Sequence, residues 1–184
     1  MTFFSNVIAG VIAKYASKYC LKPGVDESKI DRRVAGFQER ATEWLLKHPD
    51  KINYNWFSAN PHPKAVAYML AHPYKIDYHW FSKNTHPDAV AHMISHPDKI
   101  EYFTFSENPN PDAVAYLLAN PDKIYHYRFS INPSPDTVAY MLRNIDKIDY
   151  EIFSSNTHPK AVAHLLANID KIDYEIFSSN SHPK

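Results

Sequence analysis

Apolar side chains return at fixed places every 24 residues from position 48 to the last residue, without an insertion. The first complete unit reads HPDKINYNWFSANPHPKAVAYMLA, four more complete units follow, and a sixth stops within the pattern. Repetition at such a period is typical of supersecondary units that stack on one another. The pattern therefore predicts a tandem array of five and a half units over residues 48–184.

The second half of each unit predicts a helix. In the first unit, Val66, Met69 and Leu70 have the i, i+3, i+4 spacing of one helix face, and Pro63 stands at the first helical position. A His-Pro or Asn-Pro pair should end this helix, because the residue before proline disfavours the α region. We expect the recurrent Ala67 to let a neighbouring helix approach closely.

The first half of each unit predicts a shorter helix. Asn53, or an acid at its equivalent positions, is expected at the helix start, whereas Tyr125 breaks this pattern and predicts a different start in the fourth unit. Ile52 and Phe57, with their equivalents, are the expected core anchors. The helix should end near Asn60, a residue that tolerates the left-handed conformation.

Helices this short are marginal in isolation, so each unit must bury its apolar face against its neighbours. The predicted fold class is all-α, an elongated α-solenoid of two-helix units that spans on the order of 50 Å at the usual helix spacing. Residues 1–47 are predicted to form an N-terminal helical cap, because the segment Ala41–Leu46 aligns with residues 65–70. Its helices are expected near Thr2–Tyr19 and Ser28–Lys47.

The sixth unit lacks the second helix that should cover Ile172 and Phe177. An uncovered apolar face tends to find a partner, so we expect self-association through residues 168–184, or fraying there.

Composition narrows the function classes. The chain has 20 Lys and Arg against 20 Asp and Glu, which argues against a dedicated nucleic-acid or membrane-surface protein. The single cysteine, Cys20, cannot form a disulfide within the chain and favours a reducing compartment, so a cytoplasmic location is expected. The apolar stretch Val7–Ala13 is too short to span a bilayer, and we interpret it as part of a core helix rather than a targeting segment.

Three kinds of recurring polar residue could carry chemistry. Histidines at one repeat position lie about a helix spacing apart, too far to share a metal ion, so we expect helix-terminal or solvated histidines and no metal. Ser58 and Asn60 recur in all six units, which favours capping and an inter-unit hydrogen-bond ladder over a nucleophile. Lys51 and its equivalents could track phosphates, but a position at helix C-termini is the favoured interpretation. We expect no cofactor and no enzymatic activity.

The positions that differ between units form the candidate partner-binding surface. Core positions repeat while these vary, so we expect them to be exposed, and aromatic and Arg residues are what binding hot spots favour. Packing between units is the alternative, especially for the tryptophans. The set consists of Asn55, His79, Phe103 and Tyr127 at one position, Trp56, Trp80 and Arg128 at the next, and Tyr68, His92, Tyr116 and Tyr140 on the second helices.

Residues 120–124, Asn-Pro-Asp-Lys-Ile, and the segment 146–167 resemble the short helical repeats abundant in proteins of large nucleocytoplasmic DNA viruses. Those repeats read Asn-Pro-Asp-Lys-Ile-Asp-Trp, then Leu-Ser-x-Asn-Pro and an Ala-Ile-x-Leu-Leu helix. Here Phe stands for the Leu and Tyr for the Trp. The resemblance implies a repeat scaffold of viral origin in the host cytoplasm, and it implies no activity.

The sequence thus predicts a protein-interaction scaffold with a protein or peptide partner. The alternative is a nucleic-acid-binding helical repeat protein that uses the lysine ladder and the variable aromatic positions to read bases. The same phasing places Phe105 in the core and leaves Glu107 as a surface residue whose truncation costs little.

Overall fold

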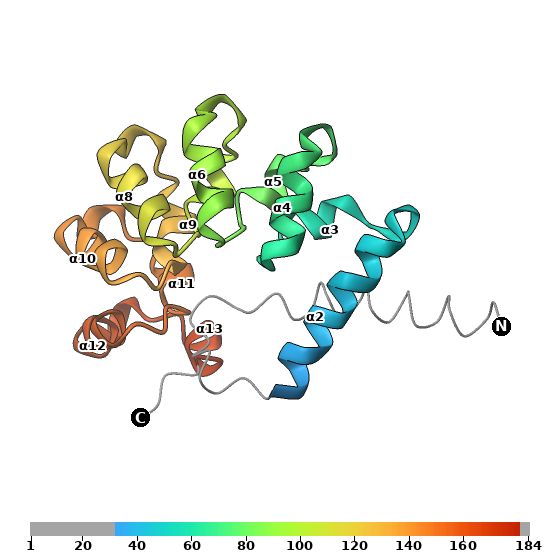
Figure 1. The fold of residues 1–184 in the computed structure, drawn as a ribbon. Coiled ribbons are helices and arrows are strands. Elements are labelled where there is room, and N and C mark those ends of the chain that lie inside the picture. The colour runs from blue at the N-terminus through green and yellow to red at the C-terminus, as the bar shows by residue number, and fades with distance from the viewer. Residues whose placement is uncertain (1–31, 181–184) are drawn as a thin grey trace.

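The computed structural model describes residues 32–180, and every regular element in this part of the chain is a helix. Figure 1 shows the predicted α-solenoid, in which each unit consists of a 3-10 turn, a short first helix and a longer second helix. The expected helix near Thr2–Tyr19, the start of the Ser28–Lys47 helix, Val7–Ala13 and Cys20 lie outside the described residues.

The elements follow the 24-residue register throughout. The long helix α2 (Arg32–Lys47) precedes the array. The first helices are α3 (Tyr54–Ser58), α5 (Tyr78–Phe81), α7 (Tyr102–Phe105), α9 (His126–Ile131), α11 (Tyr150–Phe153) and α13 (Tyr174–Ser178). The second helices are α4 (Pro63–Ala71), α6 (Pro87–Ser95), α8 (Pro111–Ala119), α10 (Pro135–Arg143) and α12 (Pro159–Ala167). The 3-10 turns are η2 (Pro49–Lys51), η3 (Pro73–Lys75), η4 (Pro97–Lys99), η5 (Pro121–Lys123), η6 (Ile145–Lys147) and η7 (Ile169–Lys171).

The 3-10 turn at the start of each unit is an element that the sequence pattern did not predict. In η3 the Lys75 amide donates to the carbonyl oxygen of His72 at 2.9 Å. Four turns begin with proline, but η6 begins with Ile145 and still has the equivalent bond, from the Lys147 amide to the carbonyl oxygen of Asn144 at 2.9 Å. Proline therefore favours the turn without being required for it.

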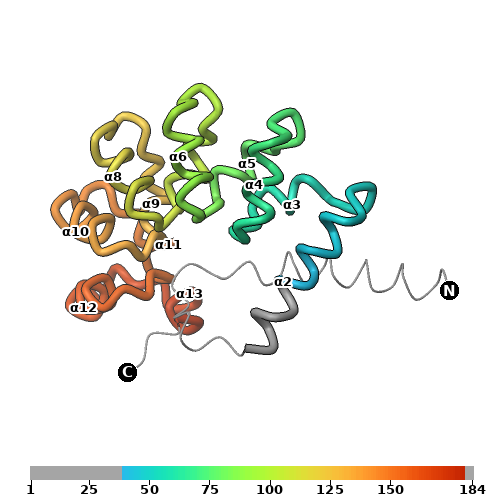
Figure 2. Tube along the Cα trace, in the orientation of Figure 1, coloured from blue at the N-terminus to red at the C-terminus, as the bar shows by residue number. Residues whose placement is uncertain are grey.

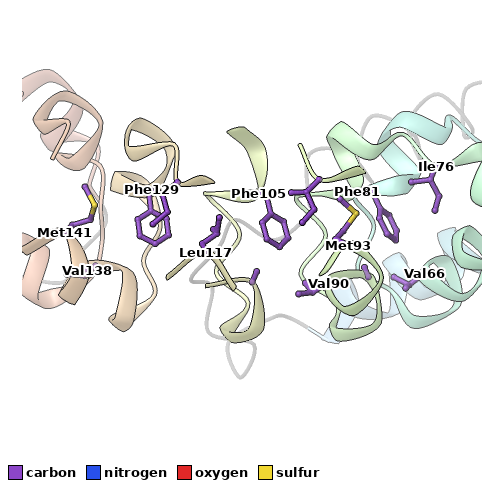
Figure 3. Packing of buried hydrophobic residues seen from close by; sticks show 14 of the residues in the cluster. Val66, Ile76, Phe81, Val90, Met93, Phe105, Leu117, Phe129, Val138 and Met141 are labelled. Carbon is purple, nitrogen blue, oxygen red and sulfur yellow. The ribbon is translucent and has the colours of Figure 1, made fainter. Parts of the chain in front are cut away.

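The core is a continuous column of apolar side chains that passes from unit to unit (Figure 3). The first helices contribute fully buried phenylalanines, and the second helices contribute fully buried Met or Leu residues. The predicted anchors Ile52 and Phe57 are confirmed as buried. The small residue at the helix contact, however, is Ala65, which is fully buried, whereas Ala67 is exposed and the prediction for it was wrong. The phenylalanines are Phe81, Phe105, Phe129 and Phe153.

The predicted caps of the first helices are confirmed in four of the six units. There an Asn or Asp side chain accepts a hydrogen bond from the amide three residues later, at Asn53, Asp77, Asp149 and Asp173. Glu101 and Tyr125 make no such bond, yet α9 begins at His126, in register with the other first helices. The expectation of a different start in the fourth unit was therefore wrong. Asn132 at the end of α9 is extended (φ −66°, ψ 119°) rather than left-handed.

The predicted hydrogen-bond ladder between units is confirmed. The Nδ2 atom of Asn84 donates to the backbone carbonyls of Ser58 and Asn60, both at 2.9 Å, in the preceding unit. The Ser58 hydroxyl donates to the Tyr54 carbonyl at 2.7 Å and accepts from the Asp77 amide of the next unit at 3.0 Å. The asparagine bonds recur at each later junction, through Asn108, Asn132, Asn156 and Asn180.

The end of α2 occupies the place of a second helix that precedes the first unit. Thr42 is buried, and its hydroxyl accepts a hydrogen bond from Asn60 Nδ2 at 3.2 Å. The Trp44 ring stacks on His48 with centroids 4.2 Å apart, a contact that Tyr68 and His72 repeat one unit later at the same distance. The sequence alignment of Ala41–Leu46 with residues 65–70 is thereby confirmed in space.

The array follows a curved path rather than a straight line (Figure 2). In Figure 1 the first helices α9, α11 and α13 lie toward the inside of the curve, and the second helices α8, α10 and α12 lie toward its outside. The repeated ladder and core thus hold the first helices in a row. The solvent-exposed side chains of these helices differ from unit to unit.

Candidate functional site

The second residue of every first helix is exposed, as predicted for the variable positions. Asn55, His79, Phe103 and Tyr127 occupy this place in the first four units. We call these residues, together with Trp56, Trp80 and Arg128 at the following position, the first-helix surface. Trp56 is 42% exposed, Phe103 37% and Tyr127 42%, as expected. Trp80 and Arg128 are half-buried, so the expectation that they are exposed was wrong for these two.

The two tryptophans of this surface pack against each other across a unit junction. The rings of Trp56 and Trp80 are 4.3 Å apart between centroids and tilted by 45°, and His79 meets Trp80 edge-on at 5.5 Å. Packing between units, the alternative to a binding role, is therefore observed. Because Trp56 also stays open on one side, the contact fixes its orientation without removing it from solvent.

Arg128 lies against two aromatic rings of the first-helix surface. Its guanidinium carbon lies 4.4 Å from the Phe103 ring centroid and 5.6 Å from that of Tyr127. Phe103 also contacts the exposed Tyr125 ring edge-on at 5.8 Å. Cation–π contacts of this kind order a long side chain in advance of binding.

A carboxylate beside Arg128 joins three consecutive units. Glu107 Oε2 lies 3.2 Å from Arg128 Nη1, and Glu107 Oε1 lies 2.5 Å from Lys83 Nζ. The Glu107 side chain is only 17% exposed, so the expectation that it is an ordinary surface residue was wrong. Lys83 also lies over the Trp80 ring, 5.5 Å from its centroid, which links the ion pair to the aromatic contacts. Sequence reasoning missed this network because Arg128 holds a different repeat position from Lys83 and Glu107, and none of the three recurs as the same residue in the other units.

The candidates on the second helices belong to a different set of contacts. Tyr68, His92, Tyr116 and Tyr140 are half-buried, and each faces the first residue of the first helix in its own unit. The Tyr68 hydroxyl lies 3.3 Å from that of Tyr54, and Tyr116 lies 3.2 Å from Tyr102. The other two stack, His92 on Tyr78 and His126 on Tyr140. These four residues are thus structural partners within their units, apart from the first-helix surface.

Burial controls the charge of the histidines in these pairs. Burial, with His96 nearby, lowers the pKa of His92, and burial with Lys147 nearby lowers the pKa of His126. The pKa of His164 is lowered for the same reason, mainly by burial. The neutral imidazole is therefore favoured at all three positions.

The lysine row, which comprises Lys51, Lys75, Lys99, Lys123, Lys147 and Lys171, ends the six 3-10 turns. Its predicted place just after the second helices is confirmed, since each turn follows such a helix directly. Five of the six ammonium groups, all but that of Lys51, reach back over tyrosine rings of the preceding unit, as in Lys99 over Tyr78 at 6.0 Å and Lys171 over Tyr150 at 5.0 Å. The lysines thus make cation–π contacts, a role that the sequence did not indicate.

The histidines near helix ends are used for capping, as expected. His62, His86 and His158 accept, through Nδ1, the amide hydrogen two residues later at the start of a second helix, at 3.2 Å in each case. Between residues 32 and 180 there is no group of three or more His, Cys, Asp or Glu side chains that could hold a metal ion. The recurring serine hydroxyls are bonded in the ladder already described.

Residues 32–180 contain no helix with the length and apolar character needed to cross a membrane. Comparison with protein-family models, with curated proteins and with solved structures gives no match for this chain.

Proposed function

We propose that this chain is a protein-interaction scaffold that docks a protein partner on the first-helix surface. The observation that carries the proposal is the contrast between the two sides of each first helix. The buried side repeats the same Ile and Phe anchors in every unit, whereas the exposed side presents Trp56, Phe103 and Tyr127 in different units. Exposed aromatic rings around an arginine are the residues that dominate binding energy at protein interfaces.

The contacts within the surface support this role. The Trp56–Trp80 contact and the placement of Arg128 against two rings restrict these side chains before any partner arrives. Ordering a flexible side chain on binding costs about 0.5–1.5 kcal/mol, so side chains that are already held lose less free energy on docking. The viral origin and the cytoplasmic location are proposed only on the sequence resemblance and on the single Cys20.

The proposal can be tested by comparing two variants with matched losses of exposed apolar surface. In the first, Phe103→Ser and Tyr127→Ser remove rings from the first-helix surface. In the control, Ile145→Ser and Leu166→Ser remove side chains of 57% and 58% exposure from η6 and α12. Immobilised wild type and both variants are incubated with cell lysate, with and without nuclease, and the retained proteins are quantified by mass spectrometry.

If the scaffold proposal is right, wild type and control retain the same specific proteins. The amount retained by the first-helix variant should be lower by roughly tenfold or more, because loss of a hot-spot residue costs above about 1.4 kcal/mol of binding free energy. Retention should survive nuclease. If nuclease removes the retained material from all three proteins, the nucleic-acid alternative is favoured. If both variants retain the same proteins equally, the first-helix surface is not the docking site.

A further inference from the structure

Lys75 differs from the rest of the lysine row in the residue that precedes it. In five units an aspartate stands directly before the lysine, and in the second unit Tyr74 takes that place. The aspartate carboxylate lies 3.2 Å from the ammonium of Lys51, 3.6 Å from that of Lys99 and 3.3 Å from that of Lys123. In the described part of the chain no carboxylate forms an ion pair with Lys75.

Tyrosine hydroxyls surround the Lys75 ammonium instead. Its Nζ lies 2.8 Å from the Tyr54 hydroxyl and 3.1 Å from the Tyr68 hydroxyl. It also lies 4.6 Å from the Tyr54 ring centroid and 5.8 Å from that of Tyr74. Hydrogen bonds to Tyr54, and then to Tyr68, raise the pKa of Lys75 above its ordinary value, so the ammonium stays charged.

The third unit provides an internal comparison. It has the same pair of tyrosines, Tyr102 and Tyr116, with hydroxyls 3.2 Å apart. The lysine that follows this pair, Lys123 in the fourth unit, pairs with Asp122 and lies over the Tyr102 ring at 5.7 Å, and no hydrogen bond joins it to either hydroxyl. Lys123, with an aspartate beside it, pairs with the carboxylate, whereas Lys75, with Tyr74 in that place, bonds to two phenols. Lys147, which follows Asp146, reaches the single hydroxyl of Tyr140 at 3.5 Å, so the double phenol contact sets Lys75 apart.

The Lys75 site keeps donors for a ligand. An ammonium has three N–H groups, and two of them are directed to Tyr54 and Tyr68. The Tyr54 hydroxyl donates to the Pro49 carbonyl at 3.2 Å, which leaves the Tyr68 hydroxyl hydrogen available to a neighbour or to a ligand. Tyr74 is 79% exposed and forms an aromatic wall at the rim of the site.

We propose that Lys75, Tyr54 and Tyr68 bind the carboxylate of an acidic side chain from a partner protein, in the place that the preceding aspartate takes in other units. The chain itself shows which anion fits, because its own carboxylates lie beside the equivalent ammonium groups of Lys51, Lys99 and Lys123. A single ammonium beside two phenols offers few hydrogen-bond donors, which suits the two oxygens of one carboxylate. The site is separate from the first-helix surface, so either proposal can fail alone.

The test is a titration of the isotope-labelled full chain with a capped tetraglutamate peptide, followed by NMR shifts of lysine and tyrosine side chains. Tyr74→Asp supplies the carboxylate found in the other units and should weaken peptide binding by roughly fivefold or more, as should Lys75→Met. The matched variant Asp122→Tyr removes the carboxylate from the fourth unit and should create a second response at Lys123. A tetraglutamine peptide and inorganic phosphate are the control ligands.

The proposal expects wild type to respond to tetraglutamate at Lys75 and not to tetraglutamine. It is overturned if Tyr74→Asp responds as wild type does, if Asp122→Tyr gains nothing, or if wild type does not respond. Tighter binding of inorganic phosphate than of the peptide would assign the site to phosphate groups and would also overturn it. Unchanged amide spectra in the variants, away from the substituted unit, show that the solenoid is intact.

Discussion

Replacement of Asn132 by alanine should be among the most damaging single polar changes in the array. Its side chain is 0% exposed and makes three hydrogen bonds. Nδ2 donates to the carbonyls of Ser106 at 3.1 Å and Asn108 at 2.9 Å, and Oδ1 accepts from the Ser134 amide at 3.0 Å. At about 0.5–1.5 kcal/mol for each bond, the expected loss is roughly 1.5–4.5 kcal/mol, and buried groups left without partners favour the upper half.

Asn60→Ala is the matched control, because Asn60 holds the same repeat position in a more open place. Its Nδ2 bonds only to the Thr42 hydroxyl at 3.2 Å, and its Oδ1 accepts from the His62 amide. At the same value for each bond, the two bonds predict a loss of about 1–3 kcal/mol, and the half-buried position favours the lower end. Asn132→Asp keeps the side-chain volume but replaces the donating amide with an oxygen that faces two carbonyl oxygens. It should therefore be at least as destabilising as alanine at neutral pH.

Urea unfolding gives the overall free energies, and native-state hydrogen exchange locates the loss, since repeat arrays can unfold in parts. The Ser134 amide should lose protection in both Asn132 variants. The reasoning fails if Asn132→Ala and Asn60→Ala cost the same within about 0.5 kcal/mol. It also fails if the Ser134 amide stays protected.

Three further predictions concern the core, the buried imidazoles and the last described unit. Phe105→Ala should lower the free energy of unfolding by about 3–5 kcal/mol, because it truncates a fully buried ring. Glu107→Ala should lower it by about 1–2 kcal/mol, because the half-buried Arg128 guanidinium loses its carboxylate. A denaturant titration that finds no effect for Glu107→Ala would contradict the ion-pair network. His92, whose pKa is lowered by burial, contributes stability that is complete above the unfolded pKa of about 6.5 and is lost as pH falls through the lower folded value. Part of that acid sensitivity should therefore disappear in His92→Tyr, as measured by urea midpoints between about pH 7.5 and pH 5. Lysine substitutions at Ile172 and Phe177 should change the sedimentation of the chain, and an unchanged oligomeric state with that unit still protected from exchange would argue against self-association there.

Most of the fold could be predicted because its determinants recur at one repeat position. Phe57 and its equivalents repeat in every unit, so the buried position stands out from the exposed ones without any structural knowledge. When two nearby residues both recur, repetition alone does not tell which of them faces the core. Ala65 and Ala67 both recur in most units, and only the direction of the helix decides that the first is buried and the second exposed.

The candidate site was less predictable, because its contacts join residues that share no periodic signal. Lys83 and Glu107 hold the same repeat position, but Arg128 holds another. Whether these three side chains come into contact depends on how successive units are oriented, which the sequence pattern does not give. The variable positions of the first helices were recognised because their residues differ from unit to unit. The residues that contact these positions were not recognised, because a contact that occurs in only one unit cannot be detected by comparing the units with one another.

The asparagine ladder also bears on how such a chain can change over generations. Every bond that Asn84 and its equivalents make to the preceding unit ends on a main-chain carbonyl. Apart from the core and the serine whose hydroxyl accepts the amide of the next unit, the side chains of the neighbour are therefore free to differ without affecting these bonds. A segment of 24 residues can be copied, removed or exchanged as a whole and still seat on its neighbour. Residues 144–160 and 168–184, which differ only at Thr157 and Ser181, are what a recent copying event of this kind would leave.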